Sequence, residues 1–248
     1  MLRILHPPGY MKERSYIFRI IFEEFLGLSY ECLECPGDTV QIRPAQVCEE
    51  GVLSWPDILF QTSPKDWLTE ASLPKTPLPV WNVSRDLPEV ILVKETIPVI
   101  YGRLVNGKSW FVQNEKIIQL GVDILGSVFF MLTRYEEVVL PFRDEHGRFP
   151  AKMSLAYREG FLDRPIVDEY VEILWACMKR LWPRLKRKDR NYQVFLSHDV
   201  DCLAGAMGKP WISVLRGISG DLAKRRDLGL AWRRFKAKVT GQYAVDPA

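Results

Sequence analysis

Two aspartates stand two positions apart, directly after an apolar run. The run is Tyr192–Ser197, and His198, Asp199, Val200 and Asp201 follow it. A short apolar run after a polar connector is typical of a strand buried on both faces of a parallel sheet. Residues two apart on an extended chain point to the same side, so Asp199 and Asp201 should project together, away from His198 and Val200.

Two carboxylates held close together repel each other unless a cation neutralises them. With a divalent metal, one carboxylate can bind the ion. The other can take a proton from metal-bound water, whose pKa falls from ~15.7 to ~7 in the best-studied zinc case. The carboxyl edge of parallel strands is also where α/β proteins build their sites. The spacing by itself leaves a second interpretation open, in which both acids cap the following loop or form surface salt bridges.

The sequence around these acids resembles a known family. Val194–Asp201 is similar to the first motif of the polysaccharide deacetylase superfamily (carbohydrate esterase family four), in its divergent form of Ser or Thr, His, Asp, Val, Asp. Upstream, Ile97–Gly102, Asp123–Glu137 and Glu159–Pro165 resemble the α/β region that precedes the deacetylase domain in bacterial proteins of this type. The resemblance therefore covers most of the chain.

This resemblance implies a metal-dependent hydrolase that uses metal-activated water to remove acetyl groups from the N-acetylated sugars of a polysaccharide. It implies Asp199 as the catalytic base and Asp201 as a ligand of the metal, with zinc as the expected ion. His198 occupies a position that the family usually fills with an aromatic residue, and is expected to be a metal ligand or to support one. The family places its two acids side by side, whereas Val200 separates them here.

The histidines of the chain are too few for the family's full site. The family adds a pair of histidines four residues apart and a later histidine that protonates the leaving amine. The sequence has three histidines, and none follows Asp201. Because catalytic zinc normally has three protein ligands, we expect the sequence to be the front part of a longer enzyme or an incomplete gene product. We expect it to be inactive alone.

The rest of the sequence predicts an α/β protein with three parts. Residues 1–184 are predicted to form an N-terminal α/β accessory domain, and the basic run 185–190 an exposed connector. Residues 191–248 are predicted to begin a truncated deacetylase-like domain, as the first strand and helical insertion of an incomplete (β/α) barrel.

Hydrophobic periodicity supports this division. It predicts helices over 12–26 and 122–135, and a third that Asp163 caps, that has Pro165 in its first turn and that ends at Pro183. Residues 29–35 and 40–43 are expected to form a hairpin, and Asn106-Gly107 the turn of another. Prolines recur from 54 to 88, so this stretch is expected to lie on the surface, held by Trp55, Trp67 and Trp81.

Composition indicates a folded protein of the cytoplasm. Hydrophobic residues make up 47% of the 248 residues and charged residues 26%, which excludes a disordered chain. No run has the length of a signal peptide or of a membrane span. Five cysteines, an odd number, fit reduced thiols better than a disulfide framework.

The basic segment 211–242 has two interpretations. It is either a helical insertion that is incompletely covered, or a surface that contacts an anionic membrane or polyanionic glycan weakly through residues 222–238. As an alternative to an enzyme, the whole chain is a non-catalytic accessory domain that binds a glycan or a protein through its tryptophan-bearing, proline-rich surface. The net charge of +3 is too small to predict specific binding of nucleic acid.

Overall fold

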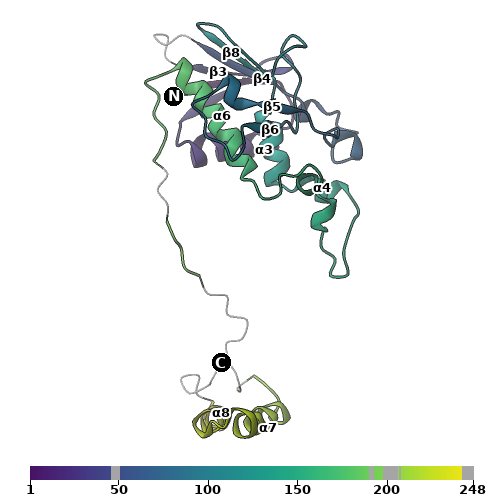
Figure 1. Cartoon of the computed structure of the whole chain (residues 1–248), viewed down its shortest axis with the longest axis vertical. Coiled ribbons are helices and arrows are strands. Elements are labelled where there is room, and N and C mark those ends of the chain that lie inside the picture. Colours follow the sequence, from purple (N-terminus) through teal and green to yellow (C-terminus); the bar gives the residue numbers. More distant parts are fainter. Residues whose placement is uncertain (46–50, 190–192, 198–205, 207, 242–248) are drawn as a thin grey trace. The chain divides into compact units, whose positions relative to one another are not determined.

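The structure is a computed structural model that describes residues 1–45, 51–189, 193–197, 206 and 208–241. The chain divides into two compact units, Met1–Arg190 and Asn191–Ala248. Figure 1 shows the sheet and most helices in the first unit, and α7 and α8 in the second. Each unit is considered by itself below.

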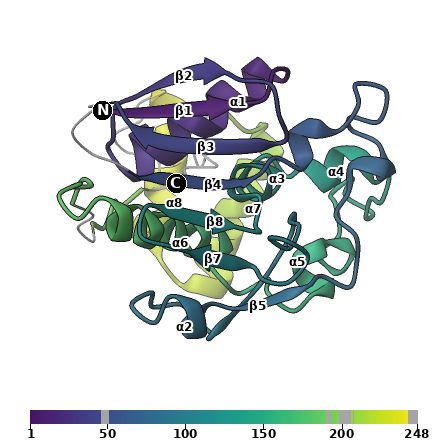
Figure 2. The same cartoon turned by 90° about the horizontal axis from the view of Figure 1, so that it is seen from above.

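A mixed six-stranded sheet organises the first unit, in the order β2-β1-β3-β4-β8-β7 (Figure 2). The pairs β1·β2 and β4·β8 are parallel and the other pairs are antiparallel, so β1, β2, β4 and β8 all run in one direction. The predicted α/β class is therefore confirmed. The strands are β1 (Leu2–His6), β2 (Tyr30–Glu34), β3 (Thr39–Pro44), β4 (Val52–Pro56), β7 (Phe111–Gln113) and β8 (Ile117–Leu120).

The strands bury alternate side chains under a layer of helices. In β1, Leu2, Ile4 and His6 are buried, whereas Arg3 and Leu5 are half-buried. The covering helices are α1 (Met11–Phe18), continued by a π-helical turn (Arg19–Phe25), α3 (Ile124–Leu132) and α6 (Ile166–Leu181). α3 packs against both α1 and α6, and α6 reaches β4 and β8. Such alternation is expected of a sheet that places one face on a core.

The predicted helices are confirmed, and α6 shows why. Its apolar positions recur at helical spacing, and Tyr170, Ile173, Leu174 and Cys177 are all fully buried. Acidic residues occupy its first turn and Lys179 and Arg180 its last, which suits the helix dipole. Shorter helices complete the first unit: α2 (Val83–Asp86), α4 (Tyr135–Val139), α5 (Leu155–Arg158) and the 3₁₀ turns Leu59–Gln61, Glu70–Ser72 and Ala151–Met153.

The predicted hairpin over residues 29–43 is wrong. Both strands form, as β2 and β3, but β1 lies between them and pairs with each. The sequence signal of β1 is only five residues long, and the helix that follows it makes a parallel crossover to β2. The local turn sequence carries no information about a long-range pairing of this kind. Two strands that are adjacent in the sequence are therefore predicted to pair with each other.

The proline-rich stretch is only partly a surface segment. Its start, Ser54–Pro56, belongs to β4 in the interior of the sheet. Further on, β5 (Val80–Asn82) pairs with β6 (Thr96–Pro98). The turn at Asn106-Gly107 forms as predicted: both residues have positive φ, 51° and 67°, and Val105 and Ser109 bridge across it.

The second unit is a helical hairpin over its described part. It consists of α7 (Trp211–Gly220), a π-helical turn (Asp221–Arg225) and α8 (Leu228–Thr240), and α7 packs on α8. In the residues that the structure describes, no helix is both long and apolar enough to cross a membrane.

Candidate functional site

The three residues predicted to carry the chemistry, His198, Asp199 and Asp201, lie outside the described residues. The run before them is described over 193–197, and it forms no strand there. Val194, Phe195 and Leu196 are 64%, 85% and 88% exposed. The prediction of a buried strand is therefore wrong for these residues as they stand. A strand is buried only when neighbours pair with it, and no described strand does.

The predicted metal site stays a prediction. Within the described parts of the chain, no cluster of three or more histidine, cysteine, aspartate or glutamate side chains could hold a metal ion. The described residues do bring other polar side chains together, at one edge of the sheet.

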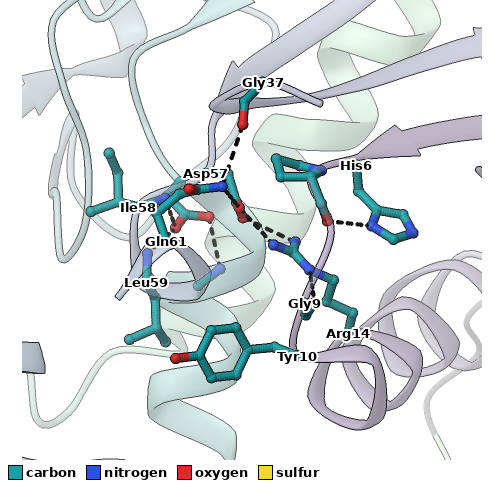
Figure 3. A network of polar contacts seen from close by, with 12 residues as sticks. His6, Gly9, Tyr10, Arg14, Gly37, Asp57, Ile58, Leu59 and Gln61 are labelled. Atoms are coloured by element: carbon teal, nitrogen blue, oxygen red, sulfur yellow. Dashed lines mark hydrogen bonds and ion pairs between the residues drawn. The ribbon is translucent and has the colours of Figure 1, made fainter. Parts of the chain in front are cut away.

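That edge is formed by the carboxyl ends of three strands that run in the same direction. β1 ends in His6 and the loop to Tyr10, β4 is followed by Asp57, and β8 leads to Asp123, which caps α3. Figure 3 shows the carbonyl of Gly9 and the carboxylate of Asp57, from the first two of these segments, at the guanidinium of Arg14. This edge is the usual place for a ligand site in an open α/β sheet.

Arg14 and Asp57 form a completely buried ion pair. The guanidinium donates from Nη1 to Oδ1 at 3.0 Å and from Nη2 to Oδ2 at 2.6 Å, and both side chains are 0% exposed. Arg14 Nε also donates to the carbonyl of Gly9 at 2.9 Å, and Gln61 Nε2 donates to Asp57 Oδ2 at 3.0 Å. The pair is bidentate, and Gly9 and Gln61 add one hydrogen bond to each partner, as a buried charge requires.

Asp123 joins the end of β8 to the segment after β4. Its Oδ2 accepts the backbone N–H groups of Ile58 and Leu59, at 2.8 and 3.0 Å, and its Oδ1 accepts that of Gly126 at 2.8 Å. Burial, with the nearby Asp57 carboxylate as a second cause, raises the pKa of Asp123 to about 7, although the three N–H donors oppose this. Burial therefore favours the protonated form of Asp123 more than in a solvent-exposed aspartate.

His6 lies at the same edge but faces the core. Its Nδ1 donates to the carbonyl of Pro7 at 2.8 Å, and its ring lies 5.4 Å from that of Phe18. Its Nε2 is buried and has no hydrogen-bond partner within the described residues. Packed among apolar side chains, His6 has no access to a substrate.

A hollow of about 360 Å³ opens beside this network, lined in part by Ile58, Lys75, Ile100 and Tyr101. Its buried polar groups bond to one another: Tyr101 Oη donates to the carbonyl of Ser72 at 2.7 Å. The described lining holds no pair of acid and base facing the hollow. The arrangement suits a rigid scaffold or a small binding site, and it lacks the groups that catalysis of hydrolysis needs.

Two of the three tryptophans of the proline-rich stretch are buried in the core, and the third is half-buried. Trp55 and Trp81 are 1% and 2% exposed, and Trp67 packs between Tyr10 and Tyr135. They hold the stretch in place, as predicted, and their ring faces are used by the core. Side chains as deeply buried as those of Trp55 and Trp81 have no ring face free to stack on a glycan.

The sequence contained a weak signal for the charged network. Arg14 stands three and four positions before Ile17 and Phe18, so helical spacing places it on the buried face of α1. Asp57 and Asp123 each follow a strand closely. A charge within an apolar helical stripe requires a buried partner, but only the fold reveals that Asp57 is that partner.

Comparisons with known proteins place most of this unit in one family. Comparison with curated proteins gives no match. Comparison with solved structures also gives no match. A family model described as "Family of unknown function (DUF7033)" matches residues 2–183, which span the whole sheet and the three helices packed on it. The chain therefore belongs to the DUF7033 family.

Proposed function

We propose that this chain belongs to a metal-dependent deacetylase of N-acetylated glycans, and that the DUF7033 domain is its accessory domain. The observation that supports the proposal is the pairing of Asp199 and Asp201 directly after an apolar run. In this run, the side chains of Val194, Phe195 and Leu196 are 64–88% exposed, and no described residue covers them. Three consecutive large apolar side chains need a cover, which neighbouring strands of a (β/α) barrel would supply.

The donors assigned to the metal fit a divalent ion in kind. A carboxylate from Asp201 and an imidazole from His198 are ligands that zinc accepts. They make two of the three protein ligands normal for a catalytic zinc, so the proposal requires at least one more, such as a histidine, that has not been assigned. When bound, the ion would polarise the acetyl carbonyl and make the attacking water more acidic.

Asp199 acts in this proposal as the base. Its carboxylate takes a proton from water as the water oxygen attacks the acetyl carbonyl carbon, and the carbon–nitrogen bond then breaks to give acetate and a free sugar amine. The amine must gain a proton as it leaves. The proton that Asp199 has taken from the water balances this step when it passes to the nitrogen.

The first experiment measures acetate release from N-acetylglucosamine oligosaccharides by the natural protein that contains this sequence. We expect Asp199→Asn to lower kcat at least a hundredfold, because general-base catalysis typically contributes ~10²–10⁴ in rate. Asp189→Asn is the matched control, since Asp189 is an exposed acid ten positions earlier. Unchanged turnover in Asp199→Asn, with folding intact by circular dichroism, would rule out the assignment of the base.

A second experiment measures bound metal by mass spectrometry. The wild-type protein should hold about one zinc or similar divalent ion for each chain, and Asp201→Ala should lower this occupancy at least tenfold. Asp199→Asn should keep the metal, which separates the base from the ligand. Equal metal content in wild type and Asp201→Ala contradicts the proposed site even if acetate is released.

A further inference from the structure

The helical hairpin of the second unit carries a strongly positive local charge. Residues 209–241 contain nine lysines and arginines against two aspartates, a net charge of +7. The whole chain has a net charge of +3, so the remaining residues together are net negative, at −4. The positive charge is therefore a property of this hairpin and not of the protein in general.

Both aspartates of the hairpin form hydrogen bonds within the hairpin itself. Asp221 is buried and accepts from Arg225 at 2.7 Å and from Arg234 at 2.8 Å. Asp227 caps α8 by accepting the backbone N–H of Leu230 at 2.8 Å. Lys224, Arg233 and Lys236 are exposed, as are Lys209, Arg216 and Arg226, whereas Lys238 is half-buried and donates to the carbonyl of Lys209 at 2.6 Å.

The large apolar side chains of α8 form an exposed stripe. Leu228, Trp232, Phe235 and Val239 follow one another at intervals of four, three and four residues, and are 77%, 63%, 40% and 58% exposed. That spacing places them on one side of the helix. The buried positions of α8 are instead small, Ala231 and Ala237.

α7 adds a second exposed stripe with Trp211 and Leu215, which are 48% and 56% exposed. Bases border the stripe of α8 on both sides. Lys236 follows Phe235 and Lys238 precedes Val239, and neighbouring residues on a helix are turned by about 100°, so the two lysines flank the stripe in opposite directions. Lys238 also lies over the ring of Trp211, 5.6 Å from its centroid.

We propose that this hairpin binds the surface of anionic phospholipid membranes, with the two helices lying in the plane of the interface. Apolar and tryptophan side chains bordered by bases are the features of an interfacial helix, in which the rings enter the headgroup region and the bases pair with lipid phosphates. A protein partner would also cover the stripe, but the exposed bases Lys224, Arg233 and Lys236 beside it match a continuous negative surface better. This inference is independent of the proposed deacetylase activity.

The test uses the 248-residue chain and vesicle co-sedimentation. Binding to vesicles of phosphatidylcholine with 30% phosphatidylserine, roughly the anionic content of a cytoplasmic leaflet, should exceed binding to pure phosphatidylcholine at least tenfold. It should weaken as salt rises from about 50 to 500 mM, because salt screens charges at a surface. Binding should also shift the tryptophan emission to shorter wavelength as Trp211 and Trp232 leave water.

Two double variants separate charge from apolar contact. Lys224→Glu with Lys236→Glu, and Trp232→Ala with Leu228→Ala, should each weaken binding to anionic vesicles at least tenfold, with helical content unchanged by circular dichroism. The matched control is Lys65→Glu with Lys108→Glu, which changes the net charge equally at exposed positions of the first unit. This control should bind as wild type does.

Three results would overturn the proposal. Equal binding to neutral and anionic vesicles would show that charge does not drive binding. If the Lys65→Glu, Lys108→Glu control loses as much vesicle binding as the hairpin variants do, the hairpin is not the binding site. The third result is absence of vesicle binding. If the chain then self-associates and Trp232→Ala abolishes this, the stripe binds a second copy of the chain. If the chain instead binds heparin tightly, the hairpin binds a polyanion.

Discussion

At the scale of single residues, the buried charges of the DUF7033 domain act together as a structural unit. Arg14 and Asp57 are both 0% exposed, so removing either leaves the other charged and unpaired in the interior. We expect Arg14→Met to lower the free energy of unfolding by about 3–5 kcal/mol, the cost of breaking a buried pair. Urea denaturation followed by tryptophan fluorescence measures it.

An exposed pair of the same type provides the control. Arg103 donates to Asp38 at 2.7 Å, but the two side chains are 57% and 61% exposed. Arg103→Met should therefore cost less than about 1 kcal/mol. Arg14→Met combined with Asp57→Leu should cost less than the sum of the two single changes, because neither charge is left alone. Additive effects would show that the two side chains are not energetically coupled.

The raised pKa of Asp123 predicts that the stability of the domain depends on pH. Burial raises its pKa to about 7 from an ordinary value of 3.8, so between these values the folded chain holds a proton that the unfolded chain has released. Its contribution to the free energy of unfolding is therefore fully present below about pH 4, falls as pH rises towards 7, and is lost above that. The total change is roughly a few kcal/mol.

Denaturation of wild type and Asp123→Asn at several pH values tests this. The variant cannot ionise, so its stability should lack the decline between about pH 4 and 7 and should rise relative to that of wild type over this range. Asp163→Asn, at an exposed acid, should keep the wild-type profile. A variant whose pH profile parallels that of wild type would contradict the raised pKa.

At the scale of elements, α6 connects the helical layer to the sheet. Leu174 is 0% exposed in the core, whereas Leu162, just before the helix, is 54% exposed. Leu174→Ala should lower the free energy of unfolding by about 2–5 kcal/mol, because it leaves a cavity. Leu162→Ala should change it by less than about 0.5 kcal/mol. Equal effects in urea denaturation would show that α6 is not packed as described.

Elements with strong local patterns were predictable, and their pairing was not. α6 follows from the spacing of Tyr170, Ile173, Leu174 and Cys177, and the turn at Asn106-Gly107 from its need for positive φ. The order of strands depends on contacts between residues far apart in the chain. β1, which separates β2 from β3, shows this. Of the charged network, Arg14 was recognisable only as an anomaly in a helical stripe.

The exposed run at residues 193–197 shows a second limit of local patterns. An apolar sequence indicates that a segment is buried in the folded protein. It does not identify the element that buries it. Val194, Phe195 and Leu196 read as a buried strand, yet the described residues leave them exposed. The prediction of Asp199 as a base depends on the same missing partner, because only a fixed strand can hold two carboxylates on one side.

At the scale of the whole molecule, the first unit is complete in its packing. Every residue of its main hydrophobic core lies between Leu2 and Trp182, and the segment after α6 folds back on the same unit. Arg187 Nη1 donates to Glu172 Oε1 at 2.7 Å, and the backbone N–H of Lys188 donates to the carbonyl of Leu26 at 2.9 Å. Residues 187 and 188 of the basic run are therefore attached to the DUF7033 domain by specific contacts.

A chain of residues 1–190 should consequently fold alone, with a melting temperature within a few degrees of that of the 248-residue chain. A chain of residues 1–181 is the informative comparison, because it also lacks Trp182, which is 2% exposed, and the contacts of Arg187. Removing a buried tryptophan typically costs ~3–5 kcal/mol, so the shorter chain should melt many degrees lower in thermal circular dichroism. If the 1–190 chain aggregates or melts as low as the 1–181 chain, the first unit depends on residues 191–248 for its stability.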